Sequence, residues 1–160
     1  MHDAEGFRKF VAVRGRALSR AAYLLTGDHA KAEDLMQETL AKAAAKWRRI
    51  SAADDPEAYL KTMMINQLRT WHRPRSLVFF PTSQPPDSGA PPPDTELKIV
   101  LRHALTTLTA KQRIVLYLRF YEDLPEAQIA ARLGCSVGTV KRHTHDALKR
   151  LRKAGIHEPA

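Results

Sequence analysis

The sequence contains little cysteine and no long apolar run. Its single cysteine, Cys135, excludes a disulfide framework and a paired-cysteine metal site. No N-terminal apolar segment resembles a signal peptide or a membrane span. We therefore expect a protein of the cytoplasm.

Sequence motifs of catalysis are also missing. There is no glycine-rich phosphate loop and no G-x-S-x-G nucleophile motif. His143 and His145 are two positions apart on a predicted helix, so their side chains diverge by about 200° and are badly placed to share a metal. The sequence predicts no enzyme activity, no metal site, no cofactor and no small-molecule substrate.

Acidic residues are outnumbered by basic ones. The 160 residues contain 26 Lys and Arg against 17 Asp and Glu, a net charge of +9. Such a balance favours an anionic partner, either nucleic acid or an acidic membrane surface. The 44% of hydrophobic residues is enough for a globular core.

Proline is unevenly distributed. Seven of the ten prolines lie between Pro74 and Pro93, among Ser, Asp, Gly and Thr. Proline breaks helices and central strands, so this stretch is predicted to be a flexible linker. We expect an all-α protein with two small helical domains, at residues 1–73 and 96–155, joined by a linker at 74–95 and followed by a tail at 156–160.

The N-terminal domain is predicted to hold three helices. The first has apolar residues at three-to-four spacing and stops at Gly27. The second runs from Asp28 through Arg49, with acidic residues in its first half and basic residues in its second. The third opens at Asp55-Pro56, an N-cap followed by proline. On the second helix an exposed, negatively biased stripe is expected at Asp34, Gln37, Glu38 and Ala41.

The C-terminal domain is predicted to hold four helices. After an amphipathic helix from Leu97, Thr109 and Gln112 have capping-box spacing for the next helix, which buries Val115, Leu118 and Tyr121. Residues 126–151 then predict a short helix, a turn at Gly134 and a second helix capped by Ser136. The exposed face of the second helix is basic. This is the helix-turn-helix geometry, which places a helix in the DNA major groove.

Residues 108–151 resemble region 4 of a bacterial RNA polymerase sigma factor of the extracytoplasmic-function (ECF, group 4) type. The matching pieces are L-x-x-x-Q-R from Leu108, L-R-x-Y-E-D-L from Leu118, and the turn and helix from Leu133 to Lys141. The run A-E-D-L-M-Q-E-T from Ala32 is similar to region 2.2 of the same family. Residues 56–73 resemble its regions 2.3 and 2.4.

The resemblance implies a sigma factor that directs core RNA polymerase to promoters and supports their opening. Three positions would bind the β′ clamp helices: Asp34, Gln37 and Glu38. Four would meet the −10 element: Asn66, Arg69, Trp71 and Arg73. Five would meet the −35 element: Arg119, Thr139, Lys141, Arg142 and His145. The C-terminal domain would lie near the β flap, and an anti-sigma factor is a further candidate partner.

Two alternatives stay open at this point. An ordinary helix-turn-helix regulator would bind duplex DNA without polymerase, usually as a dimer on palindromic half-sites. A sigma-like adaptor would bind polymerase without opening promoters, an alternative kept open by departures from the family pattern around Asn66 and at Asp146.

Overall fold

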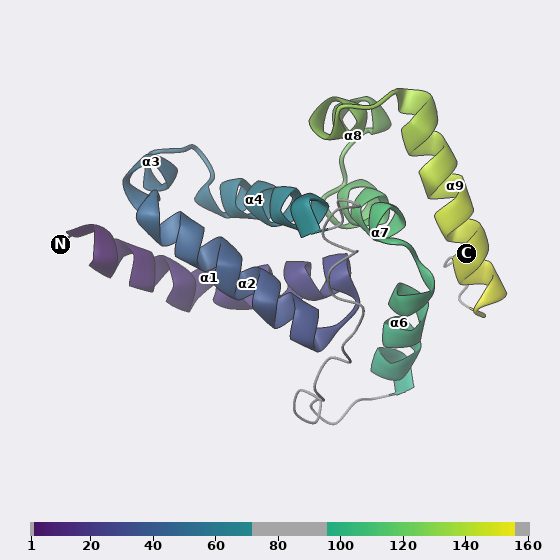
Figure 1. The fold of residues 1–160 in the computed structure, drawn as a ribbon, viewed down its shortest axis with the longest axis horizontal. Coiled ribbons are helices and arrows are strands. Elements are labelled where there is room, and N and C mark those ends of the chain that lie inside the picture. Colours follow the sequence, from purple (N-terminus) through teal and green to yellow (C-terminus); the bar gives the residue numbers. More distant parts are fainter. Residues whose placement is uncertain (1, 72–95, 156–160) are drawn as a thin grey trace. The chain divides into compact units, whose positions relative to one another are not determined.

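The computed structural model describes residues 2–71 and 96–155, and within these ranges every regular element is a helix (Figure 1). The all-α prediction is therefore confirmed. The predicted linker at 74–95, the tail at 156–160 and Arg73 lie outside the described residues. The elements are α1 (His2–Thr26), α2 (His29–Ala45), α3 (Trp47–Ser51), α4 (Pro56–Trp71), α6 (Glu96–Thr107), α7 (Ala110–Leu116), η1 (Tyr117–Tyr121), α8 (Glu126–Leu133) and α9 (Val137–Lys153).

The chain divides into two compact units, the first with α1 as far as Tyr23 and α2 to α4, the second with α6 to α9. In the first unit α2 packs against α4 (Figure 1). Their buried faces carry Leu35, Ala43, Leu60, Met64 and Leu68. The predicted start of α4 is confirmed: Pro56 is its first residue, and Asp55 Oδ1 accepts a hydrogen bond from the Ala58 amide at 3.2 Å.

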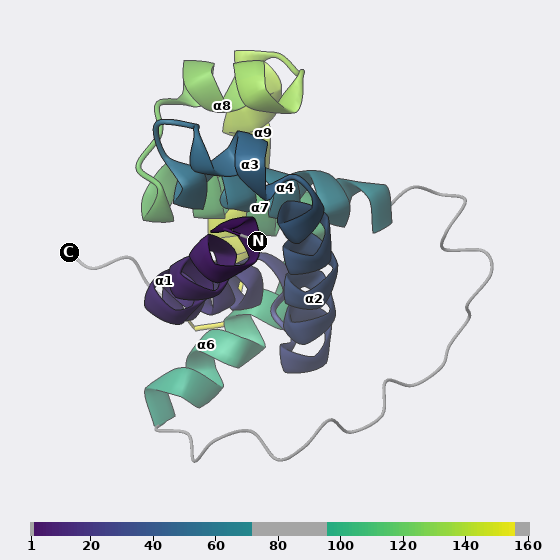
Figure 2. The same ribbon diagram turned by 90° about the vertical axis from the view of Figure 1, so that its left-hand side faces the viewer.

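The end of the second helix differs from the prediction. Instead of continuing through Arg49, α2 ends at Ala45, and the short helix α3 follows at one end of the unit (Figure 2). Lys46 separates the two, with φ −114° and ψ 18°. The turn brings the Trp47 ring against Phe7 and Phe10, at centroid distances of 5.4 and 5.0 Å. Packing of this aromatic cluster overrides the local tendency of α2 to continue.

The second unit is built around α7 and α9, with α8 packed on α9. The capping box is confirmed at the start of α7. The Gln112 amide donates to Thr109 Oγ1 at 3.1 Å, and the Thr109 amide donates to Gln112 Oε1 at 3.0 Å. The core beneath these helices contains Ile114, Val115, Leu118, Ile129, Val140 and Ala147.

The segment after α7 also differs from the prediction. Tyr117–Tyr121 forms a π-helix, η1, and Tyr121 is 41% exposed instead of buried. A π-helical turn contains one more residue than an α-helical turn, so residues beyond it move to another face. The Tyr121 ring stacks on Tyr117 at a centroid distance of 5.1 Å. The prediction that Tyr121 belongs to the core was wrong because sequence periodicity assumes an α-helix throughout.

Candidate nucleic-acid interface

The predicted helix-turn-helix is confirmed in α8, Gly134 and α9. Gly134 ends α8 in the left-handed conformation, at φ 71° and ψ 37°, and its amide donates to the Ala130 carbonyl at 2.9 Å. The Cys135 amide donates to the same carbonyl at 3.1 Å. Ser136 Oγ then accepts from the Thr139 amide at 3.1 Å, which caps α9. The sharp turn follows from glycine at a position whose left-handed backbone strains L side chains.

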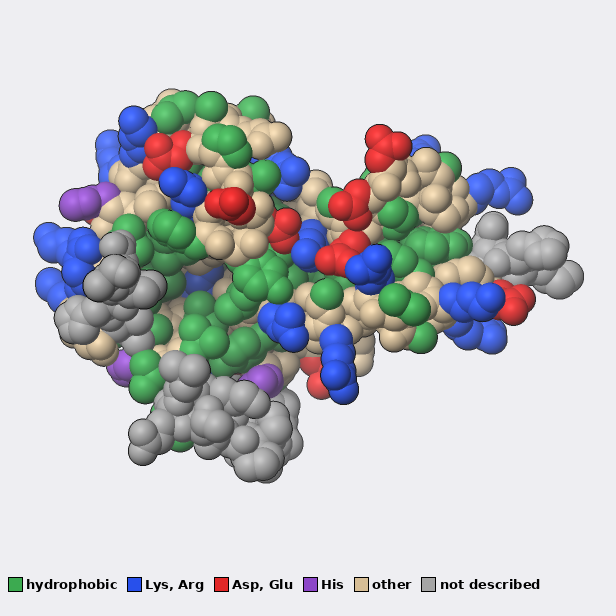
Figure 3. All heavy atoms as spheres, turned by 180° about the vertical axis from the view of Figure 1, so that it is seen from behind, with side chains coloured by type: hydrophobic (Ala, Val, Ile, Leu, Met, Phe, Trp, Pro, Cys, Tyr) green, Lys and Arg blue, Asp and Glu red, His purple; other side chains and the backbone are tan. Residues whose placement is uncertain are grey.

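The two faces of α9 differ in burial. Val140, Thr144 and Ala147 are buried, whereas Lys141, Arg142 and His145 are exposed. Figure 3 shows basic side chains gathered over the part of the surface that α9 forms. Because DNA carries a dense negative charge, this exposed face is suited to bind it. Periodicity had not singled out Thr144, whose hydroxyl donates to the Val140 carbonyl at 2.9 Å and so needs no other partner when buried.

Three of the basic residues near this face have different surroundings. Arg142 is exposed on α9. Arg150 Nη1 instead donates to the Thr107 carbonyl at 2.9 Å and so ties α9 to the end of α6. Arg119 is half-buried, with its guanidinium carbon 5.3 Å from the centroid of the Phe120 ring. Arg142 is therefore better placed to meet a base edge than the other two.

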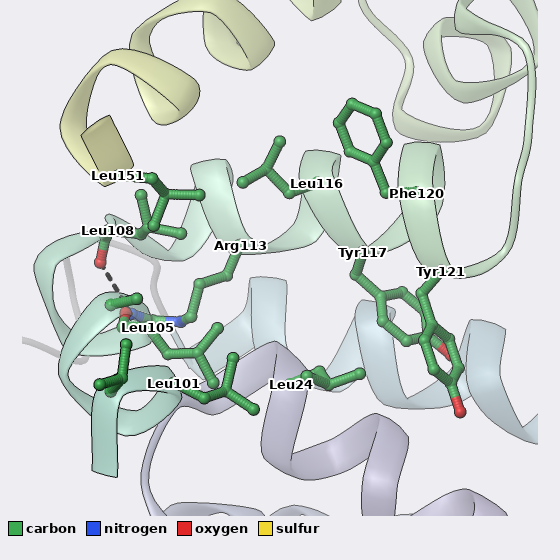
Figure 4. A pocket seen from close by; sticks show the side chains of 12 residues that line it. Leu24, Leu101, Leu105, Leu108, Arg113, Leu116, Tyr117, Phe120, Tyr121 and Leu151 are labelled. Atoms are coloured by element: carbon green, nitrogen blue, oxygen red, sulfur yellow. Dashed lines mark hydrogen bonds between the residues drawn. The ribbon is translucent and has the colours of Figure 1, made fainter. Parts of the chain in front are cut away.

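Arg113 supports the scaffold behind α9. Its Nη1 donates to the carbonyl oxygens of Leu105 and Leu108, at 3.0 and 2.7 Å, which satisfies acceptors at the end of α6 (Figure 4). Burial lowers the pKa of Arg113 from its ordinary value, but a guanidinium stays charged in proteins. The sequence had marked Arg113 only as part of a motif, without a role.

An apolar surface of the second unit was not expected. Five large side chains of α6 and η1 are at least 40% exposed: Ile99, Val100, Leu101, Phe120 and Tyr121. Figure 4 shows Leu116 and Phe120 pointing to one side of the α7–η1 segment and Tyr117 and Tyr121 to the other. The periodicity had assigned Val100 and Leu101 to a buried face. Large contiguous patches of exposed apolar side chains are typical of contact surfaces.

In the first unit the predicted acidic stripe is confirmed as an exposed surface. Asp34, Gln37 and Glu38 are exposed, and Ala41 extends the same stripe. The opposite face of α2 is buried through Ala32, Leu35, Thr39 and Ala43. These three polar residues thus form an anionic surface, which we call the α2 stripe, in a chain of net positive charge.

Three of the four predicted −10 residues lie on α4. Asn66 and Arg69 are exposed, and Trp71, the last residue of α4, is half-buried. Trp71 Nε1 donates to Glu38 Oε2 at 2.9 Å, which joins α4 to the α2 stripe. One turn further along α2 and one turn back along α4, Lys42 Nζ donates to Gln67 Oε1. Sequence spacing gives no signal for either contact, because the partners are far apart along the chain.

None of the helices in residues 2–71 and 96–155 combines the length and hydropathy of a membrane span. Among the same residues, no three His, Cys, Asp or Glu side chains gather in a way that would hold a metal ion.

Comparison with known proteins gives consistent matches. Residues 10–77 match the family profile described as Sigma-70 region 2, and residues 98–151 match that described as Sigma-70, region 4. The RNA polymerase sigma-E factor of Streptomyces coelicolor is 40% identical over 155 residues, which cover 96% of this chain and 88% of the relative. The ECF RNA polymerase sigma factor SigL of Mycobacterium tuberculosis is 34% identical over 149 residues, covering 84% and 80%.

A solved structure is similar over nearly the same span. It contains the sigma factor RpoE of Bartonella quintana in complex with the anti-sigma factor NepR. The match has a TM-score of 0.64 and 30% identity, and it covers 94% of this chain and 96% of that one.

Proposed function

Because this chain belongs to the sigma-70 family of RNA polymerase sigma factors, and to its ECF type, we propose a division of the work between its two units. The protein directs core RNA polymerase to specific promoters at transcription initiation. In our proposal α9 holds the −35 element, α4 meets the −10 element and the α2 stripe binds the polymerase. One observation carries this division: a basic recognition helix and an exposed acidic stripe lie in separate units of one chain.

The −35 contact would be made by the exposed face of α9. Lys141, Arg142 and His145 project from it, with Thr139 at its start. Arginine or lysine in the major groove can donate to guanine O6 and N7, which gives about 1 to 3 kcal/mol of discrimination for a good pair. Arg119, half-buried in η1, would lie beside the DNA backbone and neutralise a phosphate.

The −10 contact would be made by the end of α4. Asn66 and Arg69 offer an amide and a cation to bases and phosphates, and Trp71 offers a ring for stacking. Arg73 would add a further cation. Strand opening needs no chemical step, because phosphate contacts and captured bases compensate for lost pairing, at about a few kcal/mol per flipped base.

The polymerase would be bound by both units. Asp34, Gln37 and Glu38 would meet the basic clamp helices of the β′ subunit, where complementary charge mainly raises specificity and association rate. The exposed apolar side chains of α6 and η1 would face the β flap. An anti-sigma factor is a further proposed partner, because the Bartonella relative forms a complex with the anti-sigma factor NepR.

We infer that the protein acts by binding alone, in the cytoplasm, without catalysis and without a cofactor. Support comes from the family, whose members are regulators of polymerase.

The test is run-off transcription from a promoter library, using core RNA polymerase with and without the full chain. We expect specific transcripts only when the protein is present, and their start sites reveal both promoter elements. Permanganate footprinting on one such promoter should show reactive thymines near the start site. Protein that binds core enzyme but leaves these thymines unreactive would support the adaptor instead, and protein that binds promoter duplex but not core enzyme would support the autonomous regulator.

A further inference from the structure

One carboxylate of the first unit lies at two proposed sites. Glu38 belongs to the α2 stripe, and its Oε2 accepts the hydrogen bond from the indole of Trp71 at 2.9 Å. Trp71 in turn belongs to the proposed −10 contact. The two residues are 33 positions apart and come from different helices. Their contact is therefore a product of the packing of α2 on α4.

The Trp71–Glu38 hydrogen bond is one of two that join α2 to α4 along the same exposed edge, which we call the rim. Lys42 on α2 bonds Gln67 on α4, so moving four residues forward on α2 means moving four residues back on α4. This register makes α2 and α4 antiparallel, with residues of one face meeting at each turn. The indole is thus held by Glu38 at the C-terminal end of α4, with the ring half-buried.

Glu38 is exposed, so a cation of a partner can reach it. The indole brings no charge of its own to this bond, whereas an arginine brings a full positive charge and can engage both carboxylate oxygens at once. The neutral indole is a single donor. A basic partner surface would therefore displace the indole from Glu38 and not the reverse.

We propose that Glu38 is a positioning residue that couples the two sites. In the free protein it holds Trp71 against α2, and a basic side chain of the polymerase clamp takes over the carboxylate and releases the ring for stacking on an unpaired base. The inference rests on the proposed function, because it needs the α2 stripe to be the polymerase surface. By linkage, single-stranded DNA must then strengthen clamp binding by the same factor as the clamp strengthens DNA binding.

The chain offers a direct probe, since it contains only two tryptophans, Trp47 and Trp71. Full-length protein labelled with 5-fluorotryptophan should give two ¹⁹F resonances, and Trp71→Phe identifies which is which. The probe ligand is a fragment of the β′ subunit that carries the clamp helices. Its binding is measured separately by calorimetry. We expect the Trp71 resonance to move toward the position of a solvent-exposed indole on binding, while that of buried Trp47 stays in place.

The second readout is the coupling between ligands. A single-stranded oligonucleotide of the −10 sequence found in the library is titrated with and without the clamp fragment. We expect the fragment to raise its affinity about five-fold in the native protein, at the lower end of typical coupling. The factor should fall to below about two-fold in Trp71→Phe, whose ring has no N–H for Glu38 to hold. Gln67→Met, which removes the neighbouring rim bond but leaves Glu38 and Trp71, should keep the full factor.

The outcomes separate the two proposals. Fragment binding with an unmoved Trp71 resonance would overturn the coupling and leave the polymerase contact intact. An equal coupling factor in native protein and Trp71→Phe would do the same. Absence of fragment binding would overturn the polymerase contact itself, and the coupling with it.

Discussion

The side-chain oxygens of Ser136 and Thr139 lie 2.9 Å apart at the start of α9. Ser136 also accepts from the Thr139 amide, so the residue that caps the helix also holds a residue proposed to meet DNA. The cap and the first DNA-facing side chain of α9 are therefore one structural feature. Substitutions here should affect folding and binding together unless the cap is preserved.

Ser136→Ala is expected to destabilise the second unit by about 1 kcal/mol, the usual cost of losing an N-cap. The change is measured by urea denaturation followed by far-UV circular dichroism. Ser136→Asp is the matched control, because aspartate caps as well as serine but adds a negative charge near the DNA phosphates. It should keep the stability and weaken DNA binding. An equal loss of stability in both variants would show that the cap does not stabilise α9.

Gly134→Ala is expected to destabilise the same unit by about 1 to 2 kcal/mol, because alanine is strained at φ 71°. The strain is purely a backbone effect, since no atom lies within 4 Å of a Cβ placed there. Gly138→Ala provides a control of opposite sign. Gly138 is the second residue of α9, where a Cβ would meet only Ser136 Oγ at 3.8 Å, an ordinary contact distance, and alanine is the better helix former by up to about 1 kcal/mol. Thermal melts of the two variants should therefore move in opposite directions, and a parallel shift would contradict the left-handed turn.

Arg142→Ala is expected to change promoter choice without affecting folding. The side chain is exposed on α9, so its removal leaves the core intact. Loss of a bidentate contact to guanine should relax preference at one base position of the −35 element by about 1 to 3 kcal/mol. The measurement is selection from a promoter library by polymerase carrying each variant. Arg152→Ala, exposed in the last turn of the same helix, is the control for charge alone. Unchanged preference in Arg142→Ala would remove this residue from the site.

Asp34→Lys is expected to slow association with core polymerase about ten-fold or more at low salt, because charge complementarity acts mainly on encounter. The difference should shrink as salt rises, since exposed charges are screened. Glu33→Lys makes the same change of charge at the neighbouring exposed position of α2, outside the stripe. Stopped-flow or surface-binding rates that are equal for the two variants would mean that net charge, and not the α2 stripe, guides association.

Local signals in the sequence predicted most helix ends correctly. The turn at Gly134, the cap at Ser136 and the box of Thr109 with Gln112 depend on hydrogen bonds between residues at most five apart. Each end can therefore be inferred from its own neighbours. The acidic stripe of α2 and the basic face of α9 followed from helical periodicity for the same reason.

Other features could not be inferred locally. The break at Lys46 depends on Trp47 meeting Phe7 and Phe10 of another helix. The exposure of Val100 and Leu101 depends on how much of α6 the rest of the unit covers. Periodicity identifies the apolar face of a helix, but it does not show how much of that face the neighbouring helices cover.

By itself the sequence determined an all-α chain of the sigma-70 family, with the ends of most helices and the polarity of their faces, because these depend on neighbours within one or two turns. Only the tertiary structure decided that Glu38 receives the indole of Trp71, that Arg113 closes the end of α6 and that η1 turns Tyr121 outward. These contacts depend on how whole helices pack. Packing is set by the shapes of many side chains together and not by any short stretch of sequence.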